Sequence, residues 1–219
     1  MIGTDGPLVI LHDVGDEGGG RPWRSAFVDA GWRGEVLAPD LPGHAGAPPP
    51  EGGNYEPADS AYLVVPLLAR LGEPAVVVGV GVNGWTATLC GLAGKATAVV
   101  LVDGTGAPWI TPTEAIRRQR DWLRDLAADP AAIAPAPADG ALDPRLRHGL
   151  PVHGSRRLAF RAAEKLAVPL LLVESPASGA PAADADALAA AAAGGGRVVP
   201  VDDATPSSVA HEVCSVGKE

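Results

Sequence analysis

The sequence has few cysteines, few basic residues and no long apolar run, and each shortage excludes a class of protein. Its only cysteines are Cys90 and Cys214, and they form no C-x-x-C pair. This spacing favours two reduced, buried thiols over a disulfide framework or a cysteine metal site. The 17 Lys and Arg residues are outnumbered by 26 Asp and Glu residues, which gives a formal net charge of −9. Such a balance argues against a nucleic-acid partner and against binding to an anionic membrane surface.

Segments that would direct the chain to a membrane or out of the cell are also missing from the sequence. No apolar segment reaches the length of about 20 residues that a membrane-spanning helix needs. The first apolar run, residues 8–11, is far too short for a secretion signal. We therefore expect a cytoplasmic protein with no membrane partner. No His-x-His motif, His-Glu-x-x-His motif or carboxylate cluster indicates a metal site, and we expect no metal and no other cofactor.

Short apolar runs alternate with helix-compatible stretches from one end of the chain to the other. The predicted strands are 7–11, 34–38, 75–79, 96–102, 168–173 and 197–201, and the predicted helices are 22–32, 58–71, 85–92, 113–126, 156–166, 182–193 and 207–216. Such alternation is typical of a doubly wound, mostly parallel sheet, here of about six strands. We expect a single α/β domain over residues 1–219, with one insertion at about 105–155 between two strands.

Three segments of the chain resemble the α/β-hydrolase superfamily. Leu8–His12 is similar to the strand and His-Gly loop that supply one amide of that family's oxyanion hole. Leu37–Gly46 is similar to the family's D-x-P-G-H-G turn, in which His44 ties the turn together. Val77–Trp85 resembles the nucleophile elbow G-x-S-x-G, with Gly81 at the nucleophile position. The resemblance covers essentially the whole chain and implies an α/β-hydrolase fold whose insertion forms a short lid over a pocket.

The catalytic triad that this resemblance implies is absent from its expected places. Gly81 has no side chain, and no aspartate follows the strand that ends at Val173. After the last strand come Asp202 and Asp203, and the nearest histidine, His211, lies too far along on the final predicted helix. Without a hydroxyl or thiol at position 81 there is no acyl-enzyme route. Glycine tolerates the strained backbone at the apex of an elbow, so the turn itself can persist.

Four ionisable residues are candidates for acid–base chemistry at the carboxyl edge of the sheet, where open α/β folds bind ligands. His12 and Asp13 follow the first strand, Asp103 ends the strand after the elbow, and Glu174 ends the next strand. Burial at such a position raises the pKa of a carboxyl group, which suits an acid or a base. The alternatives are structural: a loop hydrogen bond for His12, a solvent-exposed loop for Asp13, an Asp-Gly turn for Asp103, and a surface charge for Glu174.

A second set of residues is predicted to bind the substrate. The backbone N–H of Val82, beside Gly81, should point into the pocket from the start of a helix and bind a carbonyl oxygen. Trp85 lies one turn from Gly81, and Trp109 lies in the insertion, so both are candidates for contact with an apolar or aromatic ligand. Trp122, also in the insertion, favours packing within the lid.

Two classes of function remain open after these observations. An enzyme that has left hydrolysis behind would act as a lyase, isomerase or cyclase on a small apolar or aromatic carbonyl compound. A pseudoenzyme would bind a ligand or partner and catalyse nothing. An esterase with a rearranged triad would need a serine within reach of His211, and Ser207 and Ser208 are in the wrong place. Because the lid is short, a second copy of the chain could complete the pocket, so a homodimer is the macromolecular partner we consider.

Overall fold

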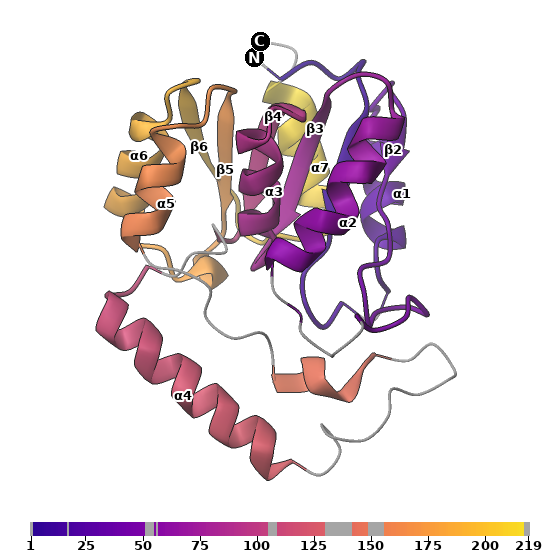
Figure 1. The fold of residues 1–219 in the computed structure, drawn as a ribbon. Helices are drawn as coiled ribbons and strands as arrows, with labels where there is room; N and C mark the ends of the chain where they lie inside the picture. The colour runs from indigo at the N-terminus through magenta and orange to yellow at the C-terminus, as the bar shows by residue number, and fades with distance from the viewer. Residues whose placement is uncertain are drawn as a thin grey trace.

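The computed structural model describes residues 2–16, 18–50, 55, 57–104, 109–129, 142–148 and 156–216, which form a parallel sheet between two layers of helices (Figure 1). The strands are β1 (Leu8–Leu11), β2 (Val36–Leu37), β3 (Ala75–Val80), β4 (Ala96–Val102), β5 (Leu170–Glu174) and β6 (Gly196–Pro200). They lie in the order β2-β1-β3-β4-β5-β6, and every neighbouring pair is parallel. The predicted doubly wound parallel sheet is confirmed.

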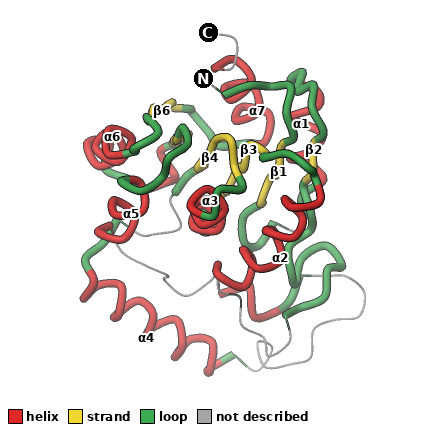
Figure 2. The backbone as a smooth tube through the Cα atoms, turned by 45° about the horizontal axis from the view of Figure 1, so that its top comes forward, coloured by secondary structure: helices red, strands yellow, loops and turns green. Residues whose placement is uncertain are grey.

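Helices connect the strands and cover both faces of the sheet (Figure 2). They are α1 (Arg21–Asp29), α2 (Pro57–Arg70), α3 (Asn83–Leu92), α4 (Pro112–Ala128), α5 (Arg156–Ala163), α6 (Ala182–Ala191) and α7 (Pro206–Val216), with 3₁₀ turns η1 (Pro144–His148) and η2 (Pro176–Ser178). Buried residues of α1 and α7 share one core cluster, and those of α2, α3, α5 and α6 share the other.

The strands alternate their side chains between these two cores. In β1, Val9 and Leu11 belong to the cluster under α2 and α3, whereas Leu8 and Ile10 belong to the cluster under α1 and α7. All four are fully buried, which explains why the run is apolar without interruption. Three aromatic side chains in and just after α1 are also buried: Trp23, Phe27 and Trp32.

Two predicted elements have different bounds in the structure. The second strand is confined to Val36–Leu37, because Gly34 donates to the Thr4 carbonyl outside the sheet and Pro39, which has no N–H, follows closely. The helix after the elbow begins at Asn83, before the predicted Trp85. It starts early because the Trp85 N–H already donates to the Val82 carbonyl, at an N···O distance of 3.3 Å.

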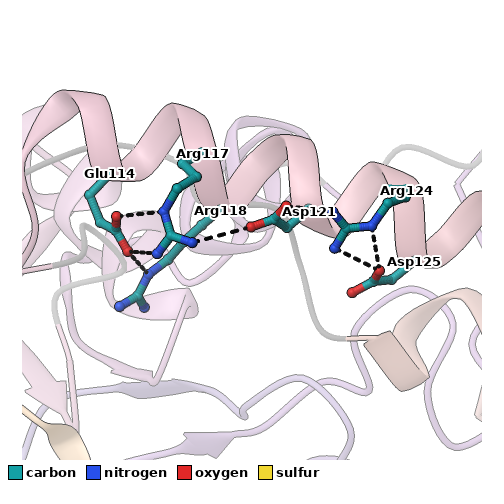
Figure 3. Close-up of polar contacts among 6 residues, drawn as sticks. All are labelled: Glu114, Arg117, Arg118, Asp121, Arg124 and Asp125. Carbon is teal, nitrogen blue, oxygen red and sulfur yellow. Dashed lines mark hydrogen bonds and ion pairs between the residues drawn. The ribbon is translucent and has the colours of Figure 1, made fainter.

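The predicted insertion contains α4, which stands clear of the sheet (Figure 1). None of its 17 residues is buried. Glu114 forms ion pairs with Arg117 and Arg118, and Asp121 forms ion pairs with Arg117 and Arg124 (Figure 3). Pairs at these spacings lie on neighbouring turns and stabilise a helix that has little packing of its own. That the insertion acts as a lid stays a prediction.

The 3₁₀ turn η1 of the insertion is held firmly against the loop after β2. Asp143 is 1% exposed and accepts hydrogen bonds from the Arg145 guanidinium and the Tyr55 hydroxyl. Its backbone N–H donates to the Gly43 carbonyl at 2.9 Å. Leu146, in η1, is buried beside Gly43. One end of the insertion is therefore tied to the turn that carries the D-x-P-G-H-G pattern.

Three further observations bear on the composition-based expectations. Cys90 and Cys214 are both buried and free, as predicted. Within the described ranges, no helix is long and apolar enough to cross a membrane. The same part of the chain contains no group of three or more His, Cys, Asp or Glu side chains that could hold a metal ion.

Candidate functional site

β3 ends in a tight turn that places Gly81 at the carboxyl edge of the sheet. Gly81 has a φ of +54°, in the left-handed region that glycine adopts at little cost. Its N–H donates to the Val102 carbonyl of β4 at 2.8 Å, and its carbonyl accepts from the Gly84 N–H at 3.1 Å, at the start of α3. The backbone therefore forms the elbow that the sequence predicts, without a side chain at its apex.

The carboxylate of Asp13 lies directly over this apex. A Cβ atom built on Gly81 would fall 2.5 Å from both Cγ and Oδ2 of Asp13. Oδ1 of Asp13 accepts a hydrogen bond from the Val14 N–H at 2.8 Å, and the carboxylate also accepts one from the Val82 N–H. One of these amides follows β1 and the other begins α3. The carboxylate thus occupies two backbone donors of the kind that stabilise an oxyanion.

Burial raises the pKa of Asp13, because the ionised carboxylate loses contact with water. The Val14 and Val82 amides lower its pKa, but burial outweighs them. Asp16 adds to the rise by charge repulsion. Asp13 is therefore a stronger base than an exposed aspartate, and it is held in a fixed position.

His12 is fully buried beneath this loop, with both ring nitrogens engaged by backbone groups. The Leu41 N–H donates to Nε2 at 3.0 Å, so the neutral ring carries its proton on Nδ1. Nδ1 donates in turn to the Asp13 carbonyl at 2.9 Å. These bonds leave no ring nitrogen for a substrate, and they fix the backbone from which the Asp13 side chain projects.

His44 packs edge-on against His12, with ring centroids 4.8 Å apart. Its Nε2 accepts from the Gly15 N–H at 3.1 Å, and its Nδ1 contacts the Pro42 carbonyl at 3.0 Å. Burial, and then the neighbouring His12, lower the pKa of His44, so the ring stays neutral at pH 7. It ties together the loops after β1 and β2, in keeping with the role that the resemblance implies.

Asn83 is a site residue that sequence reasoning missed. Its side chain is buried, and its Nδ2 donates to the His12 carbonyl at 2.7 Å. This bond joins the first turn of α3 to the loop that carries Asp13. An amide side chain within an otherwise apolar elbow, two residues after Gly81, was the available signal.

Asp103 and Glu174 lie at the ends of the adjacent strands β4 and β5. Asp103 has a φ of +48°, and its carboxylate accepts from the Ser175 N–H and hydroxyl, each at 2.6 Å. Burial raises the pKa of Glu174, the Asp103 charge raises it further, and the Ser178 hydroxyl partly opposes both. The structure thus places Asp103 and Glu174 together at the ends of neighbouring strands.

We expect Glu174→Gln to stabilise the protein at pH 7 by on the order of 1 kcal/mol. Both Oε atoms are buried, and neither accepts a hydrogen bond of normal geometry from a described residue. The folded state raises the pKa of this carboxyl group, so its ionised form costs stability above the folded pKa. Lowering the pH to about 3 protonates it in both states and should remove the gain.

Urea unfolding at the two pH values measures this effect. Asp186→Asn is the matched control, because Asp186 is exposed on α6. A gain that persists unchanged at the lower pH would contradict a buried, ionised Glu174.

The predicted tryptophans lie on the α3 and α5 side of the sheet. Trp85 and Trp109 both pack against the core cluster of that side. Trp109 also lines a groove of about 510 Å³ between the start of α4 and α5, and its indole N–H is buried with no acceptor in the described part of the chain. Trp122 is half-buried on α4.

The remaining positions of a hydrolase triad hold structural residues. Asp202 and Asp203, which follow β6, are exposed, and the Asp203 carboxylate accepts from the Thr205 hydroxyl at 3.0 Å. Thr205 precedes α7 as its N-cap, and its hydroxyl accepts from the Ser208 N–H at 3.4 Å. His211 is exposed on α7, as predicted. The side chains of the other two histidines, His148 and His153, lie outside the described residues.

Comparisons with known proteins agree with this architecture. Residues 8–214 match the model of the alpha/beta hydrolase family. No curated protein matches the sequence. A hypothetical protein from Pseudomonas aeruginosa has a similar structure, with a TM-score of 0.70 and 17% identity over 98% of this chain and 93% of that one.

Two further solved structures carry functional names. A thermophilic esterase from Thermogutta terrifontis has a TM-score of 0.69 and 17% identity, over 99% of this chain and 88% of its own. An enol-lactonase from Burkholderia xenovorans has a TM-score of 0.63 and 19% identity, over 97% of this chain and 89% of its own. At these identities the likeness establishes the fold.

Proposed function

The chain belongs to the alpha/beta hydrolase family. Within that family we propose for it a non-hydrolytic function, namely acid–base chemistry by Asp13 on a small carbonyl compound. The observation that carries the proposal is the Asp13 carboxylate, which stands over Gly81 and accepts from the Val14 and Val82 amides. A base and two carbonyl-binding donors meet at this point, and the elbow offers no nucleophile.

In the proposed reaction the substrate's carbonyl oxygen takes the Val82 N–H, while Val14 keeps its bond to Asp13. The amide polarises the carbonyl and stabilises the negative charge that develops on its oxygen. Asp13 accepts a proton from the carbon next to the carbonyl, and the electrons of that C–H bond move toward the carbonyl oxygen. Return of the proton to the same or another atom gives exchange or isomerisation.

The surroundings of the elbow support a non-hydrolytic reaction. Acyl transfer needs a nucleophile and a base that activates it. Gly81 supplies no nucleophile, and the two nearby imidazoles, His12 and His44, are engaged by backbone groups. We assign both histidines a positioning role. Catalytic roles for Asp103 and Glu174, and substrate contacts by Trp85 and Trp109, stay predictions.

Hydrogen–deuterium exchange at carbon tests the proposal directly. Phenylacetone and acetophenone in D₂O, followed by ¹H NMR, should lose their α-protons faster with the protein than without it. We expect Asp13→Asn to reduce the protein-dependent rate by about 100-fold, because the base is removed while the side-chain shape is kept. Asp186→Asn, at an exposed position on α6, is the control, and its rate should match the wild type. An Asp13→Asn variant as fast as the wild type would overturn the proposal.

An ester assay addresses the remaining hydrolase alternative. The protein should hydrolyse p-nitrophenyl acetate no faster than an equal concentration of the His211→Ala variant, since His211 is exposed on α7. Turnover that disappears in His211→Ala but survives in Gly81→Ala would establish a rearranged triad.

A pseudoenzyme is the second candidate, and one observation favours it. The Asp13 carboxylate fills the space above Gly81 that a substrate carbonyl would need. If the carboxylate stays there, the site is closed to carbonyl compounds. Exchange at the spontaneous rate with both ketones, for a protein that is folded and stable, would favour this function over acid–base catalysis.

A further inference from the structure

Arginine is concentrated in α4 and α5, although the chain as a whole is acidic. Four arginines lie in α4 and three lie in α5, against a formal net charge of −9 for the chain. A local excess of one charge on a protein of the opposite charge attracts ligands of complementary charge. In α4 the carboxylates of Glu114, Asp121 and Asp125 nearly balance the arginines, so the local positive excess lies on α5.

A groove of about 510 Å³ lies between the segment that starts α4 and the side of α5. This volume falls in the range of about 300–1000 Å³ that is usual for small-ligand sites. Its lining combines two aromatic rings, Trp109 and Phe160, with three guanidinium groups from Arg156, Arg157 and Arg161. An apolar surface edged by cations is suited to a ligand that is both flat and anionic.

The three arginines of the groove differ in whether a carboxylate holds them. Arg156 is fixed, because it donates to both carboxylate oxygens of Asp184 at 2.9 and 2.6 Å and lies over the Phe160 ring, 4.6 Å from its centroid. Arg157 and Arg161 are exposed, and no ion pair with a described residue engages either one. They are spaced one helical turn apart on α5, so both can reach the same group.

Carboxylates do little to cancel this charge. Glu164 is the one carboxylate among the residues that line the groove, and within the described residues it forms no ion pair with the arginines. The lining of the groove thus contains two guanidinium groups without an ion-pair partner among the described residues, Arg157 and Arg161, and one carboxylate, Glu164. Guanidinium groups bind phosphate and carboxylate oxygens in paired hydrogen bonds, which favours an oxyanion over a halide.

Trp109 provides an independent sign of a missing partner. Its Nε1 is buried, and none of the described residues accepts its hydrogen bond. An indole N–H in this state is unfavourable, and buried ones usually find an acceptor. A ligand acceptor atom that reached Nε1 would satisfy this donor.

We propose that the groove binds an aromatic ligand that carries a phosphate or carboxylate group. The ring lies against Trp109 and beside the Arg156 guanidinium that covers Phe160, and the anionic group is held by Arg157 and Arg161. Arg156, fixed by Asp184, shapes the aromatic floor. Neither Gly81 nor Asp13 lines the groove, so this site does not depend on the chemistry proposed for the elbow.

Calorimetric titration with 1-naphthyl phosphate tests the proposal on the full chain. We expect saturable binding that weakens by at least about tenfold in Arg157→Gln/Arg161→Gln, because charge-assisted hydrogen bonds are lost. The control, Arg120→Gln/Arg124→Gln, also removes two positive charges, but from positions on α4 outside the groove. It should change the affinity by less than about twofold. Asp13→Asn should bind as the wild type does.

Inorganic phosphate and 1-naphthalenemethanol separate the two halves of the ligand. Each should bind at least about tenfold more weakly than 1-naphthyl phosphate, since each lacks one set of contacts. Inorganic phosphate binding as tightly would show a bare anion patch, and the alcohol binding as tightly would show an apolar groove without ion recognition. Either result overturns the proposal, as does equal weakening in the two double variants.

Discussion

Gly81→Ala is expected to lower the free energy of unfolding by about 3 kcal/mol, far more than an added methyl group costs on a surface turn. Two terms contribute. An alanine at a φ of +54° is strained by about 1 kcal/mol. Its Cβ would also lie 2.5 Å from Cγ of Asp13, which forces the carboxylate off the Val14 and Val82 amides. Losing these bonds in a half-buried site costs about 2 kcal/mol more.

Two matched variants separate these terms in urea unfolding. Gly94 has a φ of +69° and nothing within 4 Å of a built Cβ, so Gly94→Ala should show the backbone strain alone. In an Asp13→Gly background the obstacle is gone, and Gly81→Ala should then cost about 1 kcal/mol. If Gly81→Ala costs the same in both backgrounds, Asp13 does not occupy the space over the elbow, and the proposed function loses its supporting observation.

The elbow could be predicted from sequence because its signals are local. An apolar run leads into closely spaced glycines, and the family pattern locates Gly81. The position of the Asp13 carboxylate could not be predicted. It depends on β1 and β3 being neighbours in the sheet, and on a loop conformation that turns one carboxylate toward two amides from different elements. Sequence reasoning placed Asp13 near the elbow but left its orientation open.

His12 illustrates the same limit in another form. Beside an aspartate, at the end of a buried strand, a histidine fits acid–base chemistry. Its actual partners include the Leu41 N–H, 29 residues away, which takes the Nε2 lone pair. A single sequence does not reveal which backbone groups a folded loop leaves unpaired, so the hydrogen bonds of a buried imidazole are decided by tertiary structure.

The helix α4 shows that an amphipathic pattern predicts a helix without predicting its burial. Its apolar residues Ile116 and Leu123 are 60% and 53% exposed. Local pairs such as Glu114 with Arg118 supply stability that packing normally provides. The predicted helix is present, but none of its residues is buried by the described part of the chain.

Asp143→Ala is expected to lower the free energy of unfolding at pH 7 by about 3 kcal/mol, because it breaks a buried network that joins the insertion to the rest of the fold. Asp143 is 1% exposed and accepts from both the Arg145 guanidinium and the Tyr55 hydroxyl. Its removal leaves a guanidinium whose side chain is 27% exposed without its carboxylate, whereas the backbone bond from residue 143 to the Gly43 carbonyl remains.

The stability that Asp143 contributes depends on pH. Burial alone would raise the pKa of Asp143, but the hydrogen bonds from Arg145 and Tyr55 outweigh it and hold the pKa below its usual value. A carboxyl group with a depressed folded pKa stabilises the protein above its unfolded pKa of about 3.9, and this contribution is lost as the pH falls through the folded pKa. The gap in unfolding free energy between wild type and Asp143→Ala, measured in urea, should therefore narrow from pH 7 to pH 3.

The control variant Tyr55→Phe removes only one neutral hydrogen-bond donor and should lower the free energy of unfolding by about 1 kcal/mol at pH 7. If Asp143→Ala cost no more than Tyr55→Phe, the network would be a surface contact, and the loop that carries His44 would be positioned without it.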